Sequence, residues 1–176
     1  MGVWGSKVDF NTGTNEEVEL DYYAGYSNSI NDSWDYDLGY IYYTYPGADD
    51  AGAEFDYGEL YGSLTFNGNT TASLYYSDDY AGEVGDSVII ALSHSFELAG
   101  DYSLTLEASQ TTLLDDAGEG YFRENDDSYN HWGVSVANNF SGFDVSLAYS
   151  DTNIKEDYWG DTADGRAVLA VSYSFE

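Results

Sequence analysis

Hydrophobic and polar residues alternate along most of this chain. In residues 17–27, Val18, Leu20 and Tyr22 alternate with Glu19 and Asp21. A period of two is typical of a β-strand whose two faces meet different environments. The same pattern predicts ten strands, over residues 2–10, 17–27, 33–45, 55–66, 69–77, 87–96, 102–110, 131–138, 143–150 and 166–175. Most are eight to twelve residues long, close to the nine to eleven that a tilted membrane strand needs.

The links between these segments alternate in length. Short links rich in Asn, Gly, Asp and Ser, the composition of hairpin turns, cover 28–32, 67–68, 97–101 and 139–142. Longer, acidic links cover 11–16, 46–54, 78–86, 111–130 and 151–165. Strict alternation places every long loop at one end of the sheet, as in outer-membrane barrels. A soluble barrel or sandwich is the alternative, although it does not require this alternation.

The sequence therefore predicts one all-β domain over residues 1–176. We expect an antiparallel, up-and-down transmembrane β-barrel of about ten strands in a bacterial outer membrane, with short periplasmic turns and long acidic extracellular loops. No apolar run is long enough for a membrane helix. Met1 stands directly before a predicted strand, so we interpret the chain as a mature form or a fragment of an exported protein.

Composition narrows the possible functions. The formal net charge of −29, from 33 acidic residues against 4 Lys and Arg, argues against binding nucleic acid. So acidic a chain is a candidate for disorder, but its 18% aromatic content argues for a folded domain. Cysteine is absent, which excludes disulfides, thiolate metal sites and a cysteine nucleophile.

Several stretches resemble the TorF family, a group of porin-like bacterial outer-membrane proteins. They are GVWGSKVDF (2–10), ELDYYAGY (19–26), YDLGYIYYTYPG (36–47), YGELY (57–61), YYSDDY (75–80), FDVSLAY (143–149) and VSYSF (171–175). The resemblance implies an outer-membrane barrel of about twelve strands, in contact with lipid and lipopolysaccharide. Two family features differ here: about two strands that precede GVWG are missing, and Glu176 follows the terminal aromatic Phe175. The chain is then either a shortened member or a barrel that closes with ten strands.

Charged residues on the polar face of the strands are candidates for the wall of a pore. They are Lys7, Glu19, Asp21, Asp35, Asp37, Glu59 and Glu107. A lumen lined mainly by carboxylates favours cations, which predicts a porin-like channel for passive diffusion of small solutes. A barrel this small can instead be filled by its own side chains, such as Tyr23 and Tyr43. The alternative function is a non-conducting surface barrel for adhesion or ligand binding through its acidic, tyrosine-rich loops.

Catalysis has little support in the sequence. The two histidines, His94 and His131, fall near opposite ends of the predicted barrel. A Ser-His-Asp arrangement around His131 with Asp126 or Asp127 is conceivable, but serine and aspartate are abundant throughout the chain. We therefore expect no enzymatic activity, and interpret His131 as an interfacial residue beside Trp132.

The acidic loops contain paired aspartates, whose oxygens are the ligands that Ca²⁺ prefers. The pairs are Asp49 and Asp50, Asp78 and Asp79, Asp115 and Asp116, and Asp126 and Asp127. No stretch has the spacing of an EF-hand loop. We expect no tightly bound cofactor, with weak Ca²⁺ binding at these loops as a hypothesis and a solvated acidic rim as its alternative.

Aromatic residues near strand ends are candidates for the two membrane interfaces. They are Trp4, Trp34, Trp132, Tyr173 and Phe175. Trp and Tyr favour the headgroup level of a bilayer because their rings are apolar and carry one polar group.

Overall fold

The computed structural model describes residues 1–8, 18–48, 55–80, 84–114, 122, 127–154 and 163–174. Every strand in this part of the chain belongs to one sheet, and each pairs antiparallel with its neighbours in sequence. The strands are β1 (Gly2–Lys7), β2 (Val18–Asn31), β3 (Trp34–Thr44), β4 (Tyr57–Phe66), β5 (Thr70–Ser77), β6 (Ser87–Glu97), β7 (Ser103–Leu113), β8 (Ser128–Phe140), β9 (Phe143–Thr152) and β10 (Arg166–Tyr173). The predicted all-β, up-and-down arrangement of ten strands is confirmed.

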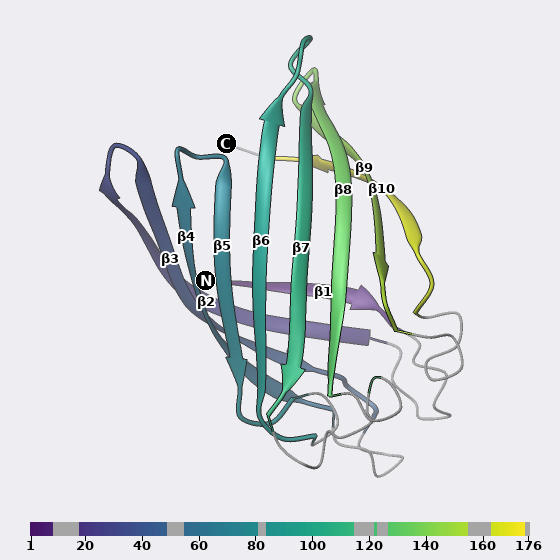
Figure 1. Ribbon diagram of the computed structural model, residues 1–176. Coiled ribbons are helices and arrows are strands. Elements are labelled where there is room, and N and C mark those ends of the chain that lie inside the picture. The colour runs from purple at the N-terminus through teal and green to yellow at the C-terminus, as the bar shows by residue number, and fades with distance from the viewer. Residues whose placement is uncertain are drawn as a thin grey trace.

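The sheet has a turn end and a loop end (Figure 1). At the turn end, short hairpins join β2 to β3, β4 to β5, β6 to β7 and β8 to β9. Residues with positive φ occupy three of these hairpins, among them Asn67 with Gly68 and Ser141 with Gly142. The strand ends from which the longer connections leave lie at the opposite end of the sheet, which we call the loop end. The predicted alternation of short and long links therefore holds in space.

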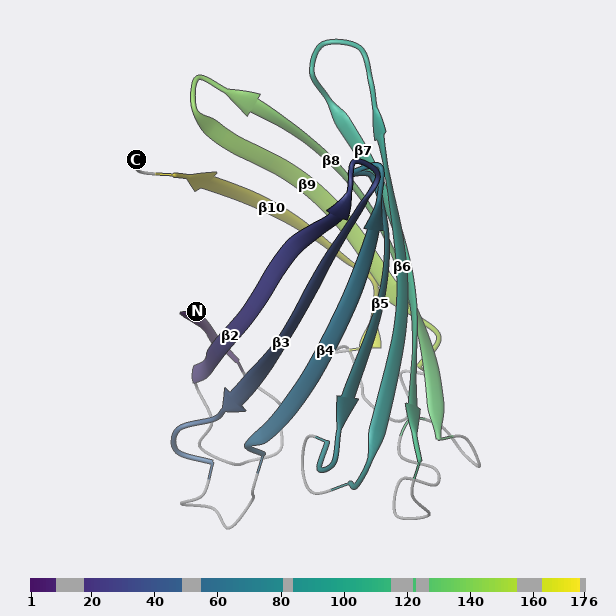
Figure 2. The same ribbon diagram turned by 90° about the vertical axis from the view of Figure 1, so that its left-hand side faces the viewer.

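The sheet curls, so that β8, β9 and β10 come round toward β1 and β2 (Figure 2). In the described residues, β1 and β10 are the first and last strands of the pairing order and form its edges. The two faces differ in exposure. On β5 the outer-face residues Ala72, Leu74 and Tyr76 are exposed, whereas Ser73 and Tyr75 on the inner face are half-buried.

Several strands are longer than the sequence pattern predicts. β2 continues to Asn31, β8 begins at Ser128 and β9 continues to Thr152. The added residues are mostly Asn, Ser, Asp and Thr, which favour turns when considered alone. They pair here because ladder hydrogen bonds use the backbone and are available to any residue except proline. A register shift between Ser29 and Asn31 marks the transition from ladder to turn.

The predicted sidedness of β1 is wrong. Trp4 is opposite Asp21 in the register and Lys7 is opposite Val18. Because directly opposed residues share a face, Trp4 lies on the acidic inner face and Lys7 on the apolar outer face. The alternation in β1 is weak, since Val3 and Trp4 are both large and apolar, and pairing with β2 decides which face each takes.

No helix in the described residues is long and apolar enough to cross a membrane.

Candidate functional site

The inner face of the sheet carries all of the predicted pore-lining residues except Lys7, and its composition changes around the curl. On β2, β3 and β4 it carries most of the acids. These are Glu19, Asp21, Asp35, Asp37 and Glu59. The pairing register places Asp35 and Asp37 opposite Ser29 and Ser27, and opposite Thr65 and Ser63, all on this face. We call this region the acidic wall.

Tyr61 lies flat across the acidic wall. Its ring covers Gly39 and its hydroxyl reaches Gly25, on the two strands next along the sheet. The hydroxyl donates a hydrogen bond to Asp37 Oδ1 over 3.1 Å. A side chain at Gly39 would overlap this ring, because a Cβ there would lie 2.6 Å from Tyr61 Cε1. Gly39 and Gly25 therefore leave the space in which the Tyr61 side chain lies against the sheet.

Glu59 occupies a covered part of the inner face. Its side chain is only 4% exposed, and it accepts a hydrogen bond from the Tyr43 hydroxyl over 3.3 Å. The Tyr43 ring stacks on Tyr57, with centroids 4.5 Å apart. Glu59 was predicted to line a pore, but its side chain is covered and is not exposed on the inner face.

Tyr45, just beyond β3, is buried beside the acidic wall. Burial raises the pKa of its phenol well above the usual value, and the Glu19 carboxylate, which accepts its hydrogen bond, raises that pKa further. Tyr45 therefore stays neutral and acts as a donor to Glu19 at any physiological pH.

From β5 to β8 the inner face is rich in hydroxyl groups and contains a hollow of about 320 Å³. Thr71, Ser73, Tyr75, Ser93 and Ser109 are among its lining residues. All of these except Tyr75 are small, which leaves room above the strands. We call this feature the hydroxyl hollow.

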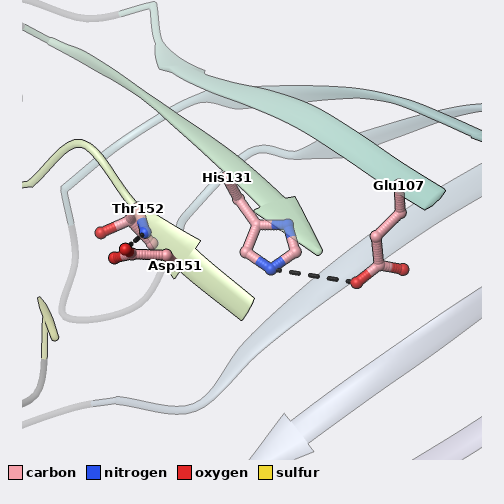
Figure 3. Close-up of polar contacts among 4 residues, drawn as sticks. All are labelled: Glu107, His131, Asp151 and Thr152. Atoms are coloured by element: carbon pink, nitrogen blue, oxygen red, sulfur yellow. Dashed lines mark hydrogen bonds and ion pairs between the residues drawn. The ribbon is translucent and has the colours of Figure 1, made fainter. Parts of the chain in front are cut away.

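Glu107 and His131 contribute a carboxyl group and an imidazole to the lining of the hydroxyl hollow. They point toward one another from β7 and β8, with Glu107 Oε1 and His131 Nε2 4.0 Å apart (Figure 3). Gly133 makes this arrangement possible, because a Cβ at that position would overlap the Glu107 carboxyl group. Asp151 and Thr152 of β9 lie beside His131, and Asp151 accepts a hydrogen bond from the Thr152 backbone N–H.

This placement of His131 differs from the interfacial position predicted beside Trp132. His131 is opposite Ser109 and Thr152, whereas Trp132 lies on the other face opposite Ala108. The carboxylate that faces His131 in the structure is that of Glu107. Sequence reasoning did not find this pair, because Glu107 and His131 come together only through the register of β7 and β8.

A small hydrophobic cluster covers the inner face at the loop end. Val84, Leu113 and Phe122 are buried there, with Tyr129 packed edge-on against Phe122 at a centroid distance of 4.5 Å. We call Val84, Leu113 and Phe122 the loop-end cluster. Polar residues in the adjoining strand segments are buried as well. They are Ser77, Ser87 and Thr111.

The outer face is an aliphatic band between two sets of aromatics. Exposed aromatics at the turn end are Trp34, Phe66, Phe96, Tyr102, Phe140, Phe143 and Tyr173. Those nearer the loop end are Tyr22, Tyr40, Tyr42, Tyr76, Trp132 and Tyr149. Leu38, Leu64, Leu74, Ile90 and Leu147 lie between them. Trp34, Trp132 and Tyr173 thus lie on the outer face near strand ends, and Phe175 lies outside the described residues.

The predicted calcium residues fall partly outside and partly inside the described residues. Asp49, Asp50, Asp115, Asp116 and Asp126 lie outside the described residues. Asp78, Asp79 and Asp127 are exposed. Within the described part of the chain, no three His, Cys, Asp or Glu residues are grouped as a metal site would require. Calcium binding at the loops stays a prediction.

Comparison with protein families identifies the chain. A family model described as "bacterial protein of unknown function (Gcw_chp)" matches residues 1–175. The chain belongs to the Gcw_chp family. The TorF resemblance is a finer assignment than this match, and it stays a prediction. No curated protein is similar enough in sequence to count as a relative.

Among solved structures, this Gcw_chp chain is similar to one titled "NanC porin structure in rhombohedral crystal form". The TM-score is 0.66 at 10% sequence identity, over 90% of this chain and 80% of the NanC chain. At that identity the likeness shows a shared fold. It agrees with the single curled antiparallel sheet described above.

Proposed function

We propose that this protein is an outer-membrane channel for the passive diffusion of small solutes, with a preference for cations. One observation carries the proposal: the sheet is apolar on its exposed outer face and acidic or hydroxyl-rich on its inner face. A membrane strand requires this sidedness because one face meets lipid and the other meets water. A soluble barrel requires the reverse, with an apolar interior.

The outer face supports the membrane location. An aliphatic band flanked by aromatics at both ends has the composition of the lipid-facing surface of a barrel. We propose that this face contacts lipid and, at the loop end, lipopolysaccharide. The finer assignment to the TorF family of porin-like proteins belongs to the same proposal, supported by the stretches that resemble that family. Similarity of fold to the NanC porin supports the channel interpretation.

The acidic wall supports the preference for cations. Asp21 and Asp37 are half-buried on the inner face, and Asp35 is exposed there. Carboxylates that share a confined space lower the potential within it, which attracts cations and repels anions. In the described residues only His131 and Arg166 place basic groups on this face, against the five carboxylates of the acidic wall.

The loop-end cluster favours a second candidate, a surface barrel that binds ligands without conducting. Phe122 and Leu113 cover part of the inner face, and Ser77 and Ser87 beneath this region are about 1% exposed. If this cover closes the whole mouth, solutes do not pass. Conductance distinguishes the two candidates directly.

The test is single-channel recording of the refolded protein in a planar bilayer under a potassium chloride gradient. We expect discrete current steps and a reversal potential that shows cation preference. Asp21→Asn with Asp37→Asn should move that preference toward neutrality, because both carboxylates lie on the inner face. The control pair, Asp32→Asn with Asp101→Asn, removes two carboxylates from the turns outside the strands and should leave selectivity unchanged. Stable insertion without current would reject the channel and favour the surface barrel.

A further inference from the structure

The hydroxyl hollow lies on a different part of the inner face from the acidic wall. Four strands, β5 to β8, contribute to it. Its volume of about 320 Å³ lies at the lower end of the roughly 300–1,000 Å³ typical of small-molecule sites. The hollow is therefore large enough for a solute of a few heavy atoms beyond water.

The lining of the hollow contains groups that can both donate and accept hydrogen bonds. Ser73, Ser93 and Ser109 present hydroxyl groups, each of which can donate one hydrogen bond and accept others, whereas the Thr71 hydroxyl is hydrogen-bonded to that of Thr65 over 2.9 Å. The rest of the lining is apolar, from Ile89, Ala91, Leu92 and Ala108. Tyr75 adds an aromatic ring, on which the C–H face of a saturated ring can pack. Such a lining matches a molecule that carries several hydroxyl groups itself.

Glu107 and His131 can hold a ligand in the hollow through hydrogen bonds. The Glu107 carboxylate has two oxygens that accept hydrogen bonds from adjacent hydroxyls of one ligand. His131, 4.0 Å away, offers a ring nitrogen to the same ligand. Both side chains retain access to the lumen, with exposures of 51% for Glu107 and 30% for His131.

Two other ligand classes fit less well. A metal ion such as Ca²⁺ takes six to eight oxygen ligands, several of them carboxylate, whereas Glu107 is the one carboxylate in the lining of the hollow. An organic cation would be held better by the acidic wall, where the carboxylates of β2 to β4 are gathered.

We propose that the hydroxyl hollow binds a small, neutral, polyhydroxylated solute of the sugar or polyol class, anchored by Glu107 and His131. The proposal rests on the proposed function in one respect, since the solute reaches the hollow through the lumen. Gly133 is a positioning residue of this site, because it leaves the space in which the Glu107 carboxyl group lies.

The test uses the full chain refolded in detergent micelles, labelled with ¹⁵N and titrated with D-glucose. We expect saturable shifts of backbone amides in β5 to β8 around the hollow. Glu107→Gln should raise the dissociation constant about tenfold or more, because hydrogen bonds to a charged acceptor are the stronger ones. Glu97→Gln, on β6 at the turn end and outside the hollow, is the matched control and should leave binding unchanged. Circular dichroism and gel mobility confirm that each variant folds.

Choline chloride, an organic cation with a single hydroxyl, is the contrasting probe. Tighter binding of choline than of glucose at the hollow would overturn the proposal, as would the absence of saturable shifts with glucose. The binding site and the channel function can be rejected independently of one another. Glucose binding in micelles without current in bilayers would leave the site and remove the channel, whereas current without glucose binding or block would leave the channel and remove the site.

Discussion

At the scale of single residues, the inner face depends on glycines that make room for larger side chains. Gly39 lies beneath the Tyr61 ring, and Gly133 lies beside the Glu107 carboxyl group. Glycine in a strand is normally a cost of about 0.5–1 kcal/mol relative to alanine. That cost is offset here because the Tyr61 ring and the Glu107 carboxyl group occupy the space that the glycines leave. Tyr61 also donates its hydrogen bond to Asp37.

The first prediction concerns Gly39. Gly39→Ala should destabilise the folded protein by about 1–3 kcal/mol, the usual cost of overpacking, because the new methyl group displaces the rigid Tyr61 ring. Urea unfolding in lipid vesicles, followed by tryptophan fluorescence, measures this change. Gly62→Ala is the control, since a Cβ there meets only the end of the flexible Leu38 side chain. Equal effects of the two substitutions would show that the Tyr61 packing is unimportant.

Individual residues also show what the sequence pattern could and could not predict. Alternation correctly placed Asp35 and Asp37 on one face, because β3 has a regular pattern on a well-paired central strand. It failed for Trp4 and Lys7, because β1 is short, contains two glycines and is apolar on both faces at its centre. Burial of Glu59 was not predictable either, since it depends on how residues distant in sequence cover β4.

At the scale of elements, the hairpins differ in how well their residues suit their backbone. Asn67 and Gly68 both have positive φ, at 50° and 71°, and Asn-Gly is the preferred sequence for such a turn. Ser141 adopts φ of 56° in the β8–β9 hairpin, where it is followed by Gly142. Serine visits this left-handed region less readily than asparagine does.

Ser141→Asn should therefore stabilise the protein, by about 0.5 kcal/mol, as part of the left-handed penalty of roughly 1–2 kcal/mol is recovered. The reverse exchange at the matched position, Asn67→Ser, should destabilise by a similar amount. Urea unfolding midpoints of both variants against the parent protein provide the measurement. A loss of stability in Ser141→Asn would mean that the serine has a role in this turn beyond its backbone conformation.

The elements themselves were the most predictable part of the fold. Ten strands and their order follow from the alternation and from the spacing of turn residues, both of which are local properties. Strand ends and register are less local. The pairing of Glu107 with Gly133, which brings His131 near, depends on how far β7 and β8 extend and on the length of the link between them. The hydrophobic pattern within one strand does not determine the register between two strands.

At the scale of the whole molecule, the question is which solvent each face meets. The outer face exposes large apolar side chains on every strand, and Leu64 on β4 is one of them at 45% exposure. A soluble protein rarely leaves so much contiguous apolar surface in water. Lipid on the outer face and water on the inner face account for both compositions at once.

Two adjacent residues of β4 provide the final prediction. Leu64→Arg places a charge on the outer face and should cost about 2–4 kcal/mol if that residue meets the bilayer centre, which reduces the fraction that folds into phospholipid vesicles. Ser63→Arg places the same charge on the inner face, opposite Asp37 in the register, where water and the carboxylate both favour it. Gel mobility of the folded band, with urea unfolding of what inserts, measures the two variants side by side. We expect Ser63→Arg to fold as the parent does and to weaken cation preference. If both variants fold equally well, the outer face does not lie in lipid, and the membrane location is rejected together with the channel.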